Sequence, residues 1–226
     1  MTDRPPSAAI VRQACVVLAE RGFREVLTAA LAESERTGFV AAGFEVRDSL
    51  HLLAHDLREI PASPAASLRR GRRTDRHAAL AADHAAFPAF WRLDEGGFHE
   101  AMAATPSARF RVATIGRRVV GYAVTGRAGS RGYLQRLAVD PHVQGRGLGR
   151  ALVVDALEWL RRRGVTNTVV NTQVENERAL TLYRSVGFQL LPTGLSVLGR
   201  SLPMPGAAAS GSGSPMRSVR DTRDRE

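Results

Sequence analysis

The chain has 226 residues, of which 44% are hydrophobic, and it carries a formal net charge of +10. This hydrophobic content supports a packed core, and no apolar run reaches the roughly 18 residues that a membrane span requires. All 32 basic residues are arginine and most are scattered, so we interpret the charge as a coding bias rather than as nucleic-acid binding. Cys15 alone excludes an internal disulfide, the six histidines show no metal-ligand pattern, and the N-terminus lacks a signal-peptide layout. We therefore expect a cytoplasmic protein without a metal.

Residues 1–60 are similar to a later part of the same chain. An Arg-Gly pair, a strand-like run, a Glu-Arg pair, a Gly-Phe pair and spaced leucines follow one another in both segments, at 21–57 and again at 163–202. The offset grows only from 142 to 145 residues, and 10–20 would match the end of the helix before the second series. We therefore predict a degenerate half-copy that packs on the rest of the chain, with Phe39 or a neighbour in place of Tyr183. The alternative is a chance similarity between short strand-helix-strand segments.

Residues 66–203 have the pattern of one α/β domain. Helical periodicity and capping residues predict helices over 76–87, 94–104, 150–163 and 176–186. Alternating or continuous apolar runs predict strands over 67–75, 110–115, 119–126, 131–139, 168–173, 188–191 and 195–202. Residues 204–226 are rich in Gly, Ala, Ser and charged side chains, which predicts a disordered tail.

A glycine-rich turn joins the strand over 131–139 to the following helix. It places glycine at every second position, at Gly145, Gly147 and Gly149, and adds Arg146 and Arg150. Glycines let backbone N–H groups approach a ligand closely, and the first N–H groups of a helix are unpaired and carry partial positive charge. The turn therefore predicts a site for a phosphate or pyrophosphate group.

The spacing excludes two common phosphate motifs. A Walker A loop requires lysine, which the chain lacks, and the third glycine comes one residue too early for a dinucleotide fingerprint. The segment Gln144-Gly145-Arg146-Gly147-Leu148-Gly149 instead resembles the coenzyme A loop of the GNAT N-acetyltransferase superfamily. The later segment from Asn176-Glu177-Arg178 to Tyr183 and Gly187-Phe188 resembles its second signature. Both are closest to the N-terminal-amine acetyltransferases that act on ribosomal proteins.

This resemblance implies the GNAT fold, a central mixed twisted α/β sheet flanked by helices, with the N-terminal half-copy packed on it. It also implies acetyl-CoA as co-substrate. The pyrophosphate is expected on the N–H groups of 145–150, and the pantetheine arm along Leu137, Ala138 and Val139, with the Val139 N–H as oxyanion donor. Cofactor contacts are thus expected from the following residues: Leu137, Ala138, Val139, Gln144, Gly145, Arg146, Gly147, Leu148, Gly149, Arg150 and Asn176.

Tyr183 matches the family's general acid, which protonates the leaving sulfur; the alternative is an aromatic core residue. No carboxylate lies on the strand over 131–139, where many relatives carry a glutamate base. Strict alternation would place Gln135, Leu137 and Val139 on one face with Tyr133, and Leu134, Arg136 and Ala138 on the other. The base candidates are Glu175, Tyr133, His99 and a water that Gln135 orients. Phe90, Trp91 and Arg92 lie where relatives cover the acceptor.

We therefore predict an N-acetyltransferase that moves an acetyl group from acetyl-CoA to a primary amine, either a protein N-terminus or a small molecule. The expected state is a monomer or homodimer, without a membrane or nucleic-acid partner. The alternative is a non-catalytic acyl-CoA-binding regulatory module, which the missing carboxylate favours.

Overall fold

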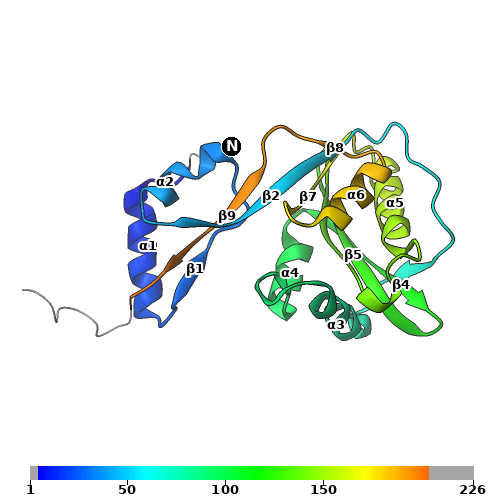
Figure 1. Ribbon diagram of the computed structural model, residues 1–226, viewed down its shortest axis with the longest axis horizontal. Helices are drawn as coiled ribbons and strands as arrows, with labels where there is room; N and C mark the ends of the chain where they lie inside the picture. The colour runs from blue at the N-terminus through cyan, green and yellow to red at the C-terminus, as the bar shows by residue number, and fades with distance from the viewer. Residues whose placement is uncertain (1–4, 204–226) are drawn as a thin grey trace, which may run out of the picture.

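A computed structural model of the chain describes residues 5–203, so the tail expected at 204–226 lies outside the described residues. One sheet runs through the whole described part, in the order β1-β9-β2-β7-β6-β5-β4-β3, with β8 also paired to β2. Figure 1 shows β2 and β9 crossing from the N-terminal segment into the larger helix-flanked body. The sheet is mixed, since β6 and β7 are parallel and the other pairs are antiparallel, and the predicted fold class is confirmed.

The helices and strands have the following bounds. The helices are α1 (Ala8–Glu20), α2 (Thr37–Val40), α3 (Arg76–Ala86), α4 (Glu95–Ala103), α5 (Leu148–Arg161) and α6 (Glu177–Ser185). The strands are β1 (Glu25–Leu27), β2 (Glu45–His55), β3 (Ser67–Arg70), β4 (Ser107–Ile115), β5 (Arg118–Ala128), β6 (Arg131–Val139), β7 (Asn167–Gln173), β8 (Gln189–Leu190) and β9 (Leu195–Ser201). None of the helices among residues 5–203 is long and apolar enough to cross a membrane.

The element order predicted for residues 66–203 is found, and most bounds differ from the predicted ones by one to three residues; β4, for example, begins at Ser107 rather than at 110. Two of the differences have a clear local cause. The strand expected over 67–75 ends at Arg70, because the Asp75 carboxylate accepts from the backbone N–H of Arg72 at 2.7 Å and folds 73–75 into a 3-10 turn. Helix α5 begins at Leu148 rather than at Arg150. Gly147 is its N-cap, with φ +77°, so Gly149 lies in the first turn instead of before it.

A β-bulge in β6 makes the expected alternation of faces wrong. Val124 of β5 pairs with Arg136, whereas the next residue, Thr125, pairs with Leu134, so Gln135 is an extra residue. An extra residue reverses the alternation on one side of it. Leu134 therefore packs in the same core cluster as Val139, instead of sharing a face with Arg136.

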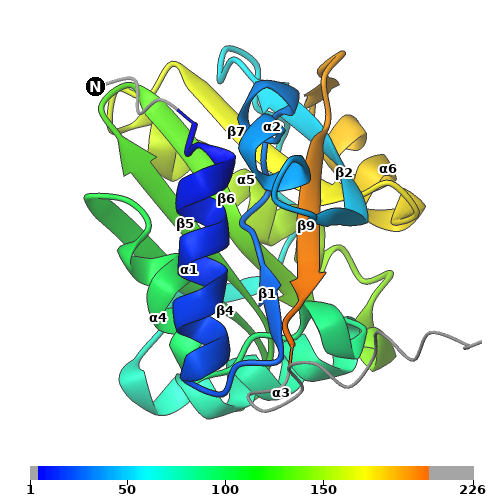
Figure 2. The same cartoon turned by 90° about the vertical axis from the view of Figure 1, so that its left-hand side faces the viewer.

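Two apolar cores lie on opposite faces of the sheet. The first is built from α5, α6 and the facing strand residues, and it includes Leu53 of β2, which is completely buried. The second packs α3 and α4 around Tyr122 and Phe98. A third cluster joins α1 and α2 to β9 and contains the buried Cys15. Figure 2 shows α1 at the front, running alongside β1 and β9.

The N-terminal segment is continuous with the domain. β2 pairs with β7 over Leu50–His55 and with β9 over Glu45–Leu50, and β1 pairs with the outer side of β9. Leu53 and Leu57 extend from this segment into the first core. Residues 5–60 are thus neither detached nor all-helical, which is the arrangement that the predicted half-copy requires.

Candidate active site

The candidate site is a cleft between two parallel strands that separate. β6 and β7 are paired only from Arg131 to Tyr133 and from Asn167 to Val169. Beyond these pairs, Leu134–Leu137 of β6 and Val170–Gln173 of β7 line opposite walls of one cavity. The bulge at Gln135 lies where the separation begins, and a bulge bends and twists its strand. The separation leaves one backbone edge of β6 open to a ligand.

The glycine turn closes one end of this cleft. Asp140 caps a short 3-10 turn over Pro141–Val143, and Gly145 and Gly147 follow with φ of +79° and +77°. An added Cβ at Gly147 would be strained by the left-handed backbone and would come into contact with Pro64 at 3.4 Å. The backbone N–H groups that open α5 consequently face the cleft without side chains in front of them.

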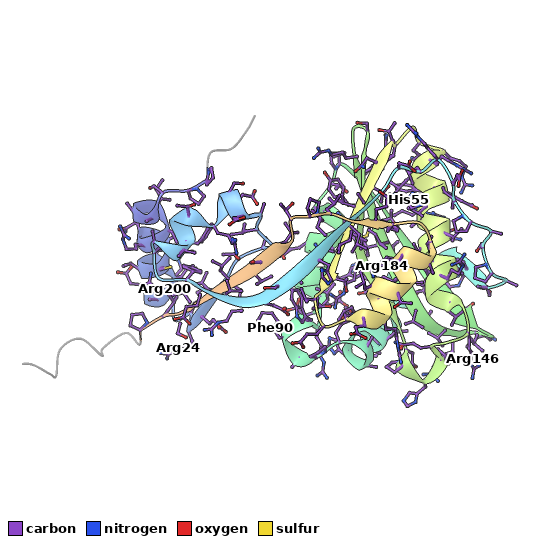
Figure 3. All side chains as sticks on the ribbon, turned by 45° about the horizontal axis from the view of Figure 1, so that its top comes forward. Arg24, His55, Phe90, Arg146, Arg184 and Arg200 are labelled. Carbon is purple, nitrogen blue, oxygen red and sulfur yellow. The ribbon has the colours of Figure 1, made fainter. Side chains whose placement is uncertain are left out.

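Most of the expected cofactor residues line one cavity of about 470 Å³. They are Leu137, Ala138, Val139, Gln144, Gly145, Gly147, Leu148, Gly149, Arg150 and Asn176. Arg146 is exposed and does not line it, and Figure 3 shows this residue at the outer edge of the domain. The Arg150 guanidinium donates to the carbonyl oxygen and hydroxyl of Ser185, so this lining residue also ties α5 to the end of α6.

The backbone of β6 presents a hydrogen-bond donor to the cleft. Asp140 donates its N–H to Val120 of β5 at 2.8 Å, and the Val139 carbonyl accepts from the Gln144 side chain at 2.9 Å. Successive N–H groups of a strand point to opposite sides. The Val139 N–H therefore points away from β5, toward the open edge, where the family resemblance implies an oxyanion donor.

Tyr183 lies at the junction of the cleft and the first core. It comes from α6, whose first turn is capped by the Asn176 side chain accepting from Ala179 at 3.0 Å. Tyr183 is 5% exposed, lines the cavity between β6 and β7, and packs on Phe188 with ring centroids 5.6 Å apart. Burial raises the pKa of its phenol far above the ordinary value, so the hydroxyl keeps its proton at neutral pH.

The base candidates are less favourably placed. Glu175 is exposed in the turn before α6, and Tyr133 is half-buried at the last paired position of β6, and neither lines the cleft cavities. His99 lies on the surface of α4, where it accepts a hydrogen bond from Arg76. Gln135 does line the cleft, and its Oε1 is buried without a hydrogen-bond partner in the described part of the chain.

An ion pair that sequence reasoning missed supports the other end of the cleft. Asp83, completely buried on α3, accepts two hydrogen bonds from Arg136 of β6 at 2.7 and 2.8 Å, and one from the Tyr122 hydroxyl at 2.7 Å. Arg136 also donates to the backbone oxygen of Trp91 at 2.6 Å, and its guanidinium stacks 3.7 Å from the Phe87 ring centroid. A carboxylate on the apolar face of a helix was the available signal, since such a position requires a partner.

Of the three loop residues Phe90, Trp91 and Arg92, which were expected near the acceptor, one lines the cleft. Trp91 lines the cavity between β6 and β7, whereas Phe90 is 45% exposed and Arg92 bonds the backbone of Phe87. The Trp91 indole donates to Asp48 of β2 at 2.8 Å. The N-terminal segment thus helps to orient a side chain of the cleft, a contact that no local sequence pattern indicates.

Fold and cleft together define a class of α/β protein that has a glycine-rich turn at a helix N-terminus beside an open strand edge. Residues 77–188 match the family described as Acetyltransferase (GNAT) family. The chain belongs to this family, and the predicted resemblance is confirmed. Within residues 5–203, no group of three or more His, Cys, Asp or Glu side chains is placed to hold a metal.

Individual relatives match over shorter stretches. The mycothiol acetyltransferase of Beutenbergia cavernae is 51% identical over 57 residues, covering 25% of this chain and 19% of that protein. The N-alpha-acetyltransferase RimI of Mycobacterium tuberculosis is 41% identical over 90 residues, covering 38% of this chain and 55% of that protein. A solved tandem GNAT protein from the clavulanic acid biosynthesis pathway superposes with a TM-score of 0.62 at 14% identity, covering 85% of this chain and 69% of that one.

Proposed function

We propose that this protein is an N-acetyltransferase that moves the acetyl group of acetyl-CoA to a primary amine by direct attack. The observation that carries the proposal is the open edge of β6, which runs from the glycine turn at the start of α5 to Tyr183. Backbone N–H groups of 145–150 hold the pyrophosphate there, because a helix N-terminus attracts anions. The pantetheine arm lies along Leu137–Val139, and Asn176 contacts it from α6.

In the proposed reaction, one proton or hydrogen-bond donor meets each of the two negative charges that develop, on the carbonyl oxygen and on the leaving sulfur. The neutral amine attacks the thioester carbonyl, and the Val139 N–H stabilises the resulting oxyanion. Collapse of the tetrahedral intermediate breaks the C–S bond, and Tyr183 gives its proton to the departing thiolate. The raised pKa of the buried phenol keeps that proton available, but it also makes the transfer uphill, which a dry site must offset.

The proton that the amine releases is expected to leave through water. The residues that line the two cleft cavities include no Asp, Glu or His within the described part of the chain. Gln135 has a buried carbonyl oxygen at the cleft and is suited to orient such a water. Glu175 and Tyr133 remain the side-chain candidates outside these cavities.

Two acceptor classes fit the cleft, a protein N-terminus and a small amine. The similarity to RimI, named an N-alpha-acetyltransferase, favours a protein N-terminus. The charge of +10 disfavours polyamines, because like charges reduce encounter. Mass spectrometry after incubation with acetyl-CoA and a library of N-terminal peptides or small amines tests this. A mass gain of one acetyl group on an acceptor supports transfer, and the absence of any acetylated product contradicts it.

The same absence of cleft carboxylates favours a second candidate, a non-catalytic acyl-CoA-binding regulatory module. Such a module binds acetyl-CoA as tightly as an enzyme but turns over no amine. Replacing Tyr183 with Phe separates the two, because a module loses nothing measurable whereas an enzyme loses rate with its cofactor affinity largely kept.

We also propose that residues 1–60 are a degenerate half-copy of the domain, and that the two copies exchange their last strands. Leu53 pairs with Leu190, and Val46 pairs with Leu198. Adding the repeat offset of 145 positions to Leu53 gives Leu198, and subtracting 144 positions from Leu190 gives Val46. The repeat therefore maps the first pair onto the second. Leu50 pairs with Leu195, and the same offset maps this pair onto itself. Such a register is expected of a pseudo-twofold exchange.

Local geometry supports the same relation. The rings of Phe39 and Phe44 contact edge to face with centroids 5.4 Å apart, and those of Tyr183 and Phe188, one repeat later, contact in a tilted arrangement at 5.6 Å. In both turns the second ring's residue donates its N–H to the carbonyl of the first at 3.1 Å. The similarity to the tandem protein also extends over 85% of the chain, well beyond residues 77–188. In this arrangement β2 completes the acetyltransferase sheet and β9 completes the N-terminal one.

A further inference from the structure

A second cavity, of about 540 Å³, lies at the opposite end of α5 from the glycine turn. Its walls come from the C-terminal part of α5, the first half of β4, α4, and the segment that leads into α3. Trp159 of this cavity is eleven residues after Leu148, which places the two sites about 16 Å apart along the helix. The cavity is therefore separate from the cleft between β6 and β7.

Arginines that are distant in the sequence meet in this cavity. Arg70 lines it from the end of β3, Arg72 and Arg73 from the turn that follows, and Arg76 from the start of α3. Arg109 and Arg111 line it from β4, and Arg163 from the turn that follows α5. The Arg-rich runs at 69–73 and 161–163 are far apart in the sequence, yet residues from both contribute to this one concave surface.

Glycine brings the first run onto the sheet. Gly71 donates its N–H to Phe110 of β4 at 3.0 Å, and a Cβ at position 71 would lie 2.2 Å from the Phe110 ring. A side chain there is excluded, so the backbone lies directly on β4 with Arg70 and Arg72 on either side. The close approach fixes these side chains at the rim of the cavity.

The positive charge of the cavity is only partly balanced. Asp155 bonds both Arg109 and Arg111, but it is not itself a lining residue, and the lining set contains no Asp or Glu. The pKa of Arg109 is lowered, first by burial and then by the charges of Arg111 and Arg162, although Asp155 opposes this.

Neighbouring groups do not supply the missing negative charge. Asp75 is held by Arg69 and the Arg72 backbone, Glu158 pairs with Arg162, and His99 accepts from Arg76. In the described structure, the side chains of Arg70, Arg72, Arg73 and Arg163 form no ion pair. Like charges gathered in a concavity repel one another, and a multivalent anion would relieve that repulsion.

We propose that this arginine-lined cavity is a binding site for a small anion that carries two or more phosphate groups. A cavity of this size suits a small ligand rather than a polymer. Guanidinium groups bind phosphate through two parallel hydrogen bonds, and several of them meet here at one opening. Phosphates provide the charge density that the lining set lacks.

The test is a calorimetric titration of the full chain, saturated with CoA, with inorganic tripolyphosphate. Saturation keeps the glycine turn occupied, so its own affinity for phosphates does not contribute. The variant R72S/R73S removes two exposed guanidinium groups from the cavity without disturbing the Asp155 network. The matched control R21S/R24S removes the same charge from exposed positions on the N-terminal segment.

We expect one tripolyphosphate per chain, tighter binding than for orthophosphate, and a loss of tenfold or more in R72S/R73S but not in R21S/R24S. An equal loss in both variants would mean diffuse charge attraction and would overturn the proposal. So would the absence of binding. Tight binding of a single-stranded RNA oligonucleotide that tripolyphosphate fails to displace would assign the arginines to an extended polymer surface and would also overturn it. If CoA does not bind, the Gly147→Glu protein serves instead, so this result stays independent of the acetyltransferase assignment.

Discussion

Replacing Asp83 with Ala tests the ion pair that joins α3, β5 and β6. The carboxylate accepts four hydrogen bonds, from Arg136 twice, from the Tyr122 hydroxyl and from the Leu93 backbone. The Arg136 side chain is only 11% exposed, and Tyr122 is fully buried, so the substitution leaves a buried charge without its counter-ion and a buried hydroxyl without its acceptor. Breaking a buried ion pair in this way costs about 3–5 kcal/mol. That loss is a large part of the roughly 5–15 kcal/mol that stabilises a typical domain.

Urea unfolding followed by circular dichroism measures this loss. Glu158→Ala is the control, because its exposed pair with Arg162 contributes only about 0.3–0.5 kcal/mol. The double variant Asp83→Ala/Arg136→Met removes the stranded charge and is expected to be more stable than Asp83→Ala alone. A destabilisation below about 1 kcal/mol for Asp83→Ala, or a double variant no more stable than the single one, would refute the reasoning.

Three further outcomes are expected. Tyr183→Phe lowers the acetyl-transfer rate with acetyl-CoA affinity largely kept; an unchanged rate in stopped-flow assays would remove Tyr183 from the mechanism. Burial lowers the pKa of His55 below its ordinary 6.5, so the neutral ring is favoured and stability falls as pH drops below that value. His55→Gln is expected to weaken this pH dependence in urea titrations at several pH values, and an unchanged dependence would contradict the assignment. Leu53→Ala, at a fully buried position of β2, costs about 2–5 kcal/mol, and the half-exposed Val46→Ala on the same strand costs far less in the same urea titration. A Leu53 effect as small as that of Val46 would mean that β2 does not complete the core.

Local patterns predicted most of the domain. The bounds of β6 are those expected, and α6 begins after Asn176, because periodicity and a capping residue are properties of neighbouring positions. The glycine turn could be predicted in the same way, because a left-handed backbone, as found at Gly145 and Gly147, favours glycine. Ten of the eleven expected cofactor residues line one cavity, whereas Arg146 faces outward, a direction that a loop sequence does not encode.

Features that depend on partners distant in the sequence could not be predicted from local patterns. The bulge at Gln135 exists only through its pairing with β5, so strict alternation gave the wrong faces for β6. Asp48 meets Trp91, and Asp83 meets Arg136, across 43 and 53 residues of chain. The proposed repeat was predicted from an offset between motifs, whereas the proposed exchange of β2 and β9 rests on the register of the sheet.

The central claim is that the glycine turn holds acetyl-CoA, and calorimetric titration of Gly147→Glu tests it most directly. Gly129→Glu is the matched control, because it adds the same charge at another glycine with positive φ, in open space at a distant hairpin. With desulfo-CoA and ATP as further ligands, the account predicts that wild type and Gly129→Glu bind acetyl-CoA specifically, whereas Gly147→Glu does not. Failure of well-folded wild-type protein to bind any acyl-CoA, or undiminished binding by Gly147→Glu, would contradict it.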